Sequence, residues 1–157
     1  MNRKVLVLGL GNTLLSDEGA GIHVIRYLQD AFPDQPDVEY LDGGTLSFTL
    51  SEPIETADAL IVVDAAELGA EAGAVRCYED AAMDEFVGGN RKRSVHEVNL
   101  IDLLAVAYLT EHLPARRALV GIQPASVDWG DGPTSAVSAA IPVAGRRILD
   151  LIEDWRQ

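Results

Sequence analysis

Short apolar runs recur along the chain between longer segments of mixed polarity. The first, residues 5–9 (VLVLG), is rich in valine and leucine and ends at a glycine, which is typical of a strand buried on both faces. Further strands are predicted at residues 38–41, 59–63, 74–78 and 117–122. The second predicted strand is stopped by Asp42 and two glycines, and the third ends at Asp64.

Helices are predicted in several of the segments between these strands. Helices are predicted over residues 17–31, with Ser16 or Asp17 as N-cap, over residues 47–51, and over residues 98–112, where apolar residues on most faces predict burial. The C-terminal helix has one apolar stripe that should face the sheet, formed by Val137, Ile141, Ala144, Ile148, Ile152 and Trp155. Pro142 lies inside this stripe and predicts a kink or a later helix start. Strands alternating with helices predict one α/β domain, residues 1–157, with a mainly parallel sheet.

Composition narrows the possible functions. The chain has 157 residues, 48% of them hydrophobic, which fits one globular domain. No apolar run approaches the ~20 residues of a membrane helix, and no signal-peptide cleavage site is evident, so we expect a cytoplasmic protein. A single cysteine, Cys77, agrees with this, because a disulfide framework needs pairs. The net charge of −13 disfavours nucleic acid and anionic lipid; it fits a cationic partner, a metal ion, or solubility alone.

Carboxylate and imidazole side chains follow the predicted strands. Glu18 lies in the loop after the first strand, Asp42 and Asp64 follow the second and third, and His96 precedes a helix. Ligands of open α/β sheets bind beyond the carboxyl ends of the strands, so these groups can converge there, and such donors suit a divalent transition metal. Each residue also has a plainer interpretation: helix-terminus charge for Glu18, turn residues for Asp42 and Asp64, and an ordinary loop histidine for His96.

Several other motifs are excluded. A dinucleotide-binding loop would need a third glycine where Leu14 stands, and a zinc-protease helix would need a second histidine where Leu100 stands. There is no G-x-S-x-G elbow for a serine nucleophile. Cys77 lies in the middle of a predicted strand, so it is interpreted as a small buried hydrophobic residue and not as a nucleophile.

The sequence resembles the hydrogenase maturation endopeptidases in five segments that occur in order along essentially the whole chain. The first is residues 9–21 (GLGNTLLSDEGAG), and the next three are residues 42–45 (DGGT), 62–65 (VVDA) and 94–97 (SVHE). The last comprises residues 121–124 (GIQP) and 128–130 (DWG), followed by the alanine-rich C-terminal helix.

This resemblance implies a specific function. Such enzymes remove a C-terminal extension from the large-subunit precursor of a nickel–iron hydrogenase after nickel insertion, and their nickel-sensing ligands correspond to Glu18, Asp64 and His96. It also implies a three-layer α/β/α sandwich whose five-stranded sheet has one antiparallel strand, at residues 74–78. We expect the nickel to be carried by the substrate and the enzyme to be a monomer.

Two points stay open at this level. The metal can polarise the attacking water, or it can only dock the substrate while a carboxylate, Asp42 or Asp17, activates the water. A nickel metallochaperone without proteolytic activity is the alternative function, because the acidic surface and the three ligands fit it equally well.

Overall fold

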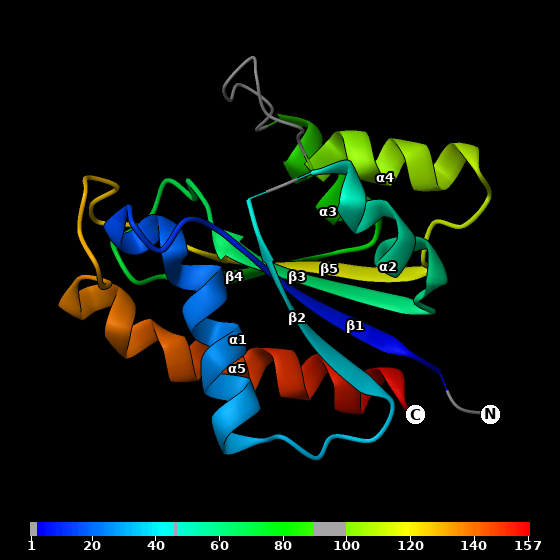
Figure 1. The fold of residues 1–157 in the computed structure, drawn as a ribbon, viewed down its shortest axis with the longest axis horizontal. Helices are drawn as coiled ribbons and strands as arrows, with labels where there is room; N and C mark the ends of the chain where they lie inside the picture. The colour runs from blue at the N-terminus through cyan, green and yellow to red at the C-terminus, as the bar shows by residue number, and fades with distance from the viewer. Residues whose placement is uncertain (1–2, 46, 90–99) are drawn as a thin grey trace.

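The computed structural model describes residues 3–45, 47–89 and 100–157. Its centre is a five-stranded sheet in the order β2-β1-β3-β5-β4 (Figure 1). The strands are β1 (Val5–Leu10), β2 (Val38–Gly44), β3 (Ala59–Ala65), β4 (Val75–Glu79) and β5 (Arg116–Ile122). Neighbouring strands are parallel except β4, which pairs antiparallel with β5. The predicted mainly parallel sheet with one antiparallel strand is confirmed.

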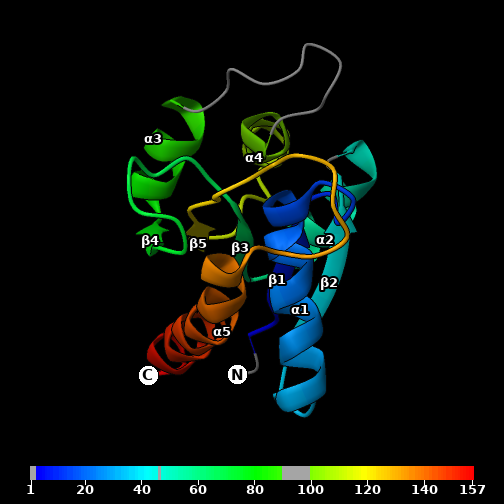
Figure 2. The same cartoon turned by 90° about the vertical axis from the view of Figure 1, so that its left-hand side faces the viewer.

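Helices cover both faces of the sheet, which gives the predicted three layers (Figure 2). One layer contains α1 (Ala20–Ala31) and α5 (Ser135–Trp155). The other contains α2 (Ser51–Thr56), α3 (Ala81–Gly89) and α4 (Leu100–Leu109). Alternate side chains of β3 separate the two cores, because Ile61 and Val63 pack toward α1 and α5 whereas Leu60 and Val62 pack toward α2 to α4.

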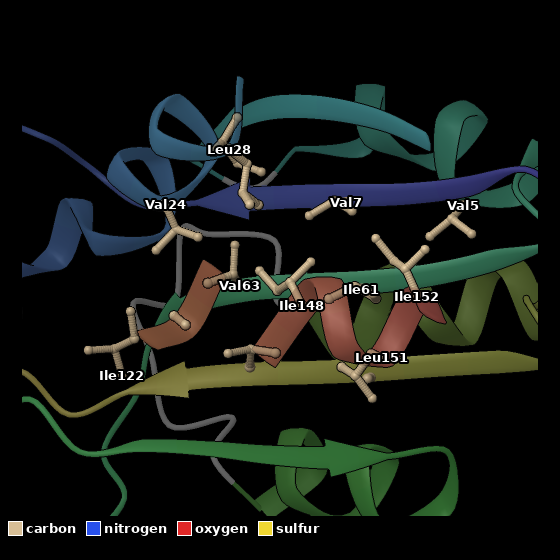
Figure 3. Close-up of a cluster of buried hydrophobic side chains, with 14 of the residues drawn as sticks. Val5, Val7, Val24, Leu28, Ile61, Val63, Ile122, Ile148, Leu151 and Ile152 are labelled. Atoms are coloured by element: carbon tan, nitrogen blue, oxygen red, sulfur yellow. The ribbon is translucent and has the colours of Figure 1, made fainter. Parts of the chain in front are cut away.

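The apolar stripe of α5 lies against the sheet as predicted. Ile148, Leu151 and Ile152 face Val5 and Ile61 in the close-up of this core (Figure 3). The alternative of a later helix start is wrong, since α5 begins at Ser135 and includes Pro142. Pro142 and Ser138, whose carbonyl loses its helical donor, are both exposed, so water can replace the missing hydrogen bond. Despite its length α5 carries several charged residues, and no helix in the described ranges is long and apolar enough to cross a membrane.

Other helix predictions need correction. Helix α3 was not predicted, and α4 ends at Leu109 with the side chains of Tyr108 and Leu109 exposed. The short helix predicted over residues 47–51 is a 3-10 turn, η2 (Phe48–Leu50), that continues into α2. The helix predicted from residue 17 begins as a separate 3-10 turn, η1 (Ser16–Gly19), and α1 follows it. Neither Ser16 nor Asp17 caps α1, whose N-cap is Gly19, because both side chains bind a distant loop instead.

Two glycines bring α1 onto the sheet. A Cβ atom at Gly21 would overlap the carbonyl oxygens of Val63 and Leu10, and one at Gly9 would overlap Ile25. The first turn of α1 therefore rests directly on the carboxyl ends of β1 and β3, and this contact sets the position of η1 just before it.

We predict that Gly21→Ala lowers the free energy of unfolding by about 1–3 kcal/mol, because the added methyl group meets backbone that cannot move aside. Urea unfolding followed by circular dichroism measures this change. Gly132→Ala is the matched control, since no described atom lies within 4 Å of its Cβ position, and its effect should stay within about 0.5 kcal/mol. Equal effects of the two substitutions would contradict the close contact.

Candidate active site

The candidate residues Asp64 and Asp42 both belong to strands, but they point to opposite faces of the sheet. Asp64 is the sixth residue of β3 and alternates with Val63, so it lies on the face that packs against α2 to α4. Asp42 pairs with Gly9 and lies two residues after Tyr40, which packs toward α1 and α5. Asp42 therefore points to the same face as Tyr40. With β1 between β2 and β3, the two strands are about 10 Å apart. Both carboxylates lie at the carboxyl edge of the sheet, as the sequence predicts, but they lie on opposite faces of it.

Glu18 lies at the same carboxyl edge as Asp64. It belongs to η1, which packs beside β3, and its side chain is half-buried, like that of Asp64. The loop that carries Glu18 is folded tightly on itself, because Gly11 has a φ of 142° and a Cβ there would overlap the Glu18 carbonyl oxygen. Only glycine fits this conformation, so Gly11 fixes where the backbone of Glu18 sits.

His96 lies outside the described residues. Helix α4 begins at Leu100 and belongs to the layer toward which Asp64 points. Within the described ranges, no three His, Cys, Asp or Glu side chains are grouped to hold a metal ion. The three-ligand set of Glu18, Asp64 and His96 therefore stays a prediction.

Asp42 has a local partner. Its side chain is exposed, and its Oδ1 accepts a hydrogen bond from the backbone N–H of Gly44 at 3.0 Å. Gly44 has a φ of 56°, a left-handed conformation that favours glycine. This geometry fits the turn interpretation of Asp42, in which the carboxylate shapes the loop after β2.

Asp17 is fully buried and accepts four hydrogen bonds from a segment more than a hundred residues away. Its Oδ1 accepts from the Thr134 backbone N–H at 2.7 Å. Its Oδ2 accepts from the Thr134 hydroxyl at 2.8 Å and from the N–H groups of Ala125 and Ser126 at 2.8 and 3.1 Å. Burial alone would raise the pKa of Asp17, but these hydrogen bonds outweigh it and hold that pKa below its usual value. A buried, fully bonded and weakly basic carboxylate is poorly placed to activate water, so Asp17 has a structural role.

Residues 123–134, which link β5 to α5, are bound to the loop after β1 by further hydrogen bonds, and Figure 2 shows this segment passing over the start of α1. The N–H of Ser16 donates to the Gly130 carbonyl at 3.0 Å, and the N–H of Gly130 donates to the Leu14 carbonyl at 3.0 Å. The Ser16 hydroxyl donates to the Asp128 carbonyl at 2.7 Å. The two loops thus form one hydrogen-bonded rim beside Glu18.

Comparison with known proteins identifies the family. The family model described as hydrogenase maturation protease matches residues 22–151. The chain belongs to the hydrogenase maturation protease family.

Relatives of known name agree with this assignment. The hydrogenase expression/formation protein HupD of Rhizobium leguminosarum bv. viciae is 35% identical over 97% of this chain and 75% of its own length. The hydrogenase 2 maturation protease of Escherichia coli K12 is 32% identical over 96% and 92% of the two chains. The solved structure of the hydrogenase maturating endopeptidase HybD from E. coli superimposes with a TM-score of 0.88 at 31% identity, covering 96% and 93%.

Another buried polar side chain of this protease, Gln123, supports the opposite flank of the site. Its Oε1 accepts from the N–H of Leu68 at 2.7 Å, and its Nε2 donates to Glu67 at 3.2 Å. The loop that follows Asp64 is held in this way. The roles of Gln123 and of the Asp17 hydrogen bonds could not be predicted from the sequence, because their partners are distant along the chain.

The cysteine of the protease has no features of a nucleophile. Cys77 lies in the middle of β4, half-buried against the core beside Val120. Burial is the main cause that raises the pKa of its thiol, and Glu79 adds to it. A high thiol pKa disfavours the reactive thiolate. The interpretation of Cys77 as a packing residue fits these features.

We predict that Asp17→Asn lowers the free energy of unfolding by about 3 kcal/mol at pH 7, because buried donors lose an ionised acceptor. Since the folded-state pKa lies below the ordinary value of 3.8, this contribution is complete above about pH 5 and is lost as the pH falls through the folded-state pKa. Urea unfolding of both proteins from pH 7 to pH 3 should show their stabilities converging.

Asp131→Asn is the control, because Asp131 is an exposed carboxylate of the same rim. It should leave stability unchanged at pH 7. A difference between wild type and Asp17→Asn that stays constant down to pH 3 would show that the ionised carboxylate is not the stabilising species.

Proposed function

We propose that this protease removes the C-terminal extension of a nickel–iron hydrogenase large-subunit precursor after nickel insertion, and that Glu18, Asp64 and His96 recognise the nickel in that substrate. Family membership supports the proteolytic part. The observation that carries the site is the position of Glu18 and Asp64, on adjacent elements at one edge of the sheet.

The donor set suits a metal that arrives with the substrate. Two carboxylates and one imidazole supply oxygen and nitrogen ligands without a thiolate, so they hold a borderline ion less firmly than cysteines do. A three-donor site also leaves coordination positions open, and ligands of the precursor can occupy these. The enzyme then engages only a precursor that already contains its nickel, which explains how an immature substrate is refused.

The reaction is hydrolysis of one peptide bond. Water adds to the scissile carbonyl carbon and loses a proton, the C–N bond breaks, and the leaving amine gains a proton. Nickel in the substrate can polarise the water or carbonyl. Alternatively it only docks the precursor, and a carboxylate takes the proton. Of the carboxylates considered for that role, buried Asp17 is disfavoured. Asp42 is exposed, but it lies on the other face of the sheet from Asp64 and supports the loop at Gly44.

We predict that Glu18→Gln and Asp64→Asn each reduce cleavage of the nickel-loaded precursor by about 100-fold or more, because a misplaced reacting group costs on that order. Mass spectrometry of the precursor before and after incubation measures the loss of the tail. Glu153→Gln, which changes an exposed carboxylate of α5, is the charge-matched control and should cleave normally. Normal processing by both Glu18→Gln and Asp64→Asn would exclude the shared site. A precursor mass unchanged by the wild-type enzyme would favour the metallochaperone alternative.

Nickel dependence tests where the metal resides. The enzyme should cleave nickel-loaded precursor and spare the same precursor without nickel. Treating the enzyme alone with a chelator, and then removing the chelator, should leave its activity intact. Efficient cleavage of nickel-free precursor, or lasting inactivation by the chelator, would contradict a substrate-borne metal.

A further inference from the structure

The rim beside Glu18 displays three exposed apolar side chains. Leu14 is 56% exposed, Val127 is 51% exposed and Trp129 is 80% exposed. Leu14 comes from the loop after β1 and the other two come from the segment before α5, and the hydrogen bonds between these loops bring them together. Leu14, Val127 and Trp129 are called the rim patch below.

The rim patch is held on a fixed backbone. Both neighbours of Trp129 are tied to the opposite loop, since the Asp128 carbonyl accepts from the Ser16 hydroxyl at 2.7 Å and Gly130 exchanges hydrogen bonds with Leu14 and Ser16. A tryptophan fixed in this way loses little further backbone entropy when a partner covers it. Tryptophan is also among the residues that contribute most to binding energy at protein interfaces.

The two segments that form the rim carry charge of one sign. Neither residues 9–21 nor residues 121–134 contain a lysine or an arginine. The acidic residues in these segments are Asp17, which is buried, and Glu18, Asp128 and Asp131. A complementary partner therefore combines apolar side chains with basic ones.

The rim patch adjoins the candidate site along the chain, because the loop that carries Leu14 runs directly into η1 and Glu18. We propose that the rim patch is a docking surface for a segment of the hydrogenase precursor that flanks the cleaved bond and combines apolar with basic residues. This rests on the proposed function. The metal would then select the maturation state of the substrate, and the rim patch would recognise its polypeptide.

Binding and cleavage of nickel-loaded precursor by Trp129→Ala test this proposal. Half-saturation of cleavage and the dissociation constant, measured by titration and by surface plasmon resonance, should both rise by at least 10-fold. The cleavage rate at saturation should change by less than 3-fold, because Trp129 positions no reacting group. Binding should also weaken with added salt, and Asp131→Asn should reduce that salt dependence.

Tyr108→Ala and Val143→Ala are the matched controls for Trp129→Ala. Their side chains are 68% and 55% exposed, and they lie on α4 and on α5, outside the rim. Both controls should bind and cleave as wild type does. Thermal unfolding verifies that every variant is folded, as expected for exposed positions.

Each outcome separates the docking surface from the proposed function. Unchanged binding by Trp129→Ala, or equal weakening by Tyr108→Ala, would overturn the docking surface and leave the protease assignment intact. Wild-type binding without cleavage, with the Trp129 effect retained, would overturn the proposed function and keep the docking surface. Sedimentation that shows a dimer broken by Trp129→Ala would identify a second copy of the chain as the occupant and overturn the proposal.

Discussion

The buried carboxylate of Asp17 organises the edge of the sheet on which the proposed chemistry depends. An ionised group without water must find several donors, and four hydrogen bonds from Ala125, Ser126 and Thr134 supply them. They join the loop after β1 to the segment before α5. Glu18 is the next residue, so the interaction that closes the fold also fixes the backbone from which the candidate ligand projects.

The direction of side chains along the strands explains which carboxylates can cooperate. A strand turns successive side chains to opposite faces, and parallel neighbours in register point the same way. Asp64 thus faces the layer containing α4, while Asp42 faces the layer containing α1. Position at the carboxyl edge brings residues near one another, but the parity of their positions in the strand decides whether they share a site.

Much of the fold could be predicted from the sequence because the central strands are buried on both faces. Strands β1 and β3 contain no exposed residue, as Val5, Leu6, Ile61 and Val62 illustrate. An unbroken apolar run of this kind is a strong sequence signal for a buried strand. Helix α3 was missed because only Met83 and Val87 are buried in it, too few to mark a helical stripe. The antiparallel direction of β4 came from the family resemblance, since an apolar run has no preferred direction.

The candidate ligands of the site could be chosen from the sequence, but the role of Asp17 could not. Glu18 and Asp64 are candidates because ligands of α/β sheets bind beyond the carboxyl ends of the strands, which needs only strand order along the chain. Their role as ligands stays a prediction. The role of Asp17 did not follow, because an aspartate before a helix is most often an N-cap, and the competing partner, Thr134, is 117 residues away. The correct prediction for such a residue requires knowledge of which loops meet, and loop contacts leave no periodic signal.

These hydrogen bonds also bear on how the proposed hydrolysis, which uses no serine or cysteine nucleophile, would be directed to one bond. Substrate binding must supply the orientation that a covalent intermediate supplies elsewhere, and misplacement of about 1 Å can reduce the rate by on the order of 100-fold. Close packing at Gly11, the hydrogen bonds of Asp17 and those of Gln123 hold the described loops on both sides of Glu18 and Asp64. This arrangement suits the proposal that the substrate brings its own metal, because the enzyme would then need only to present ligands and a docking surface to a metal-loaded precursor.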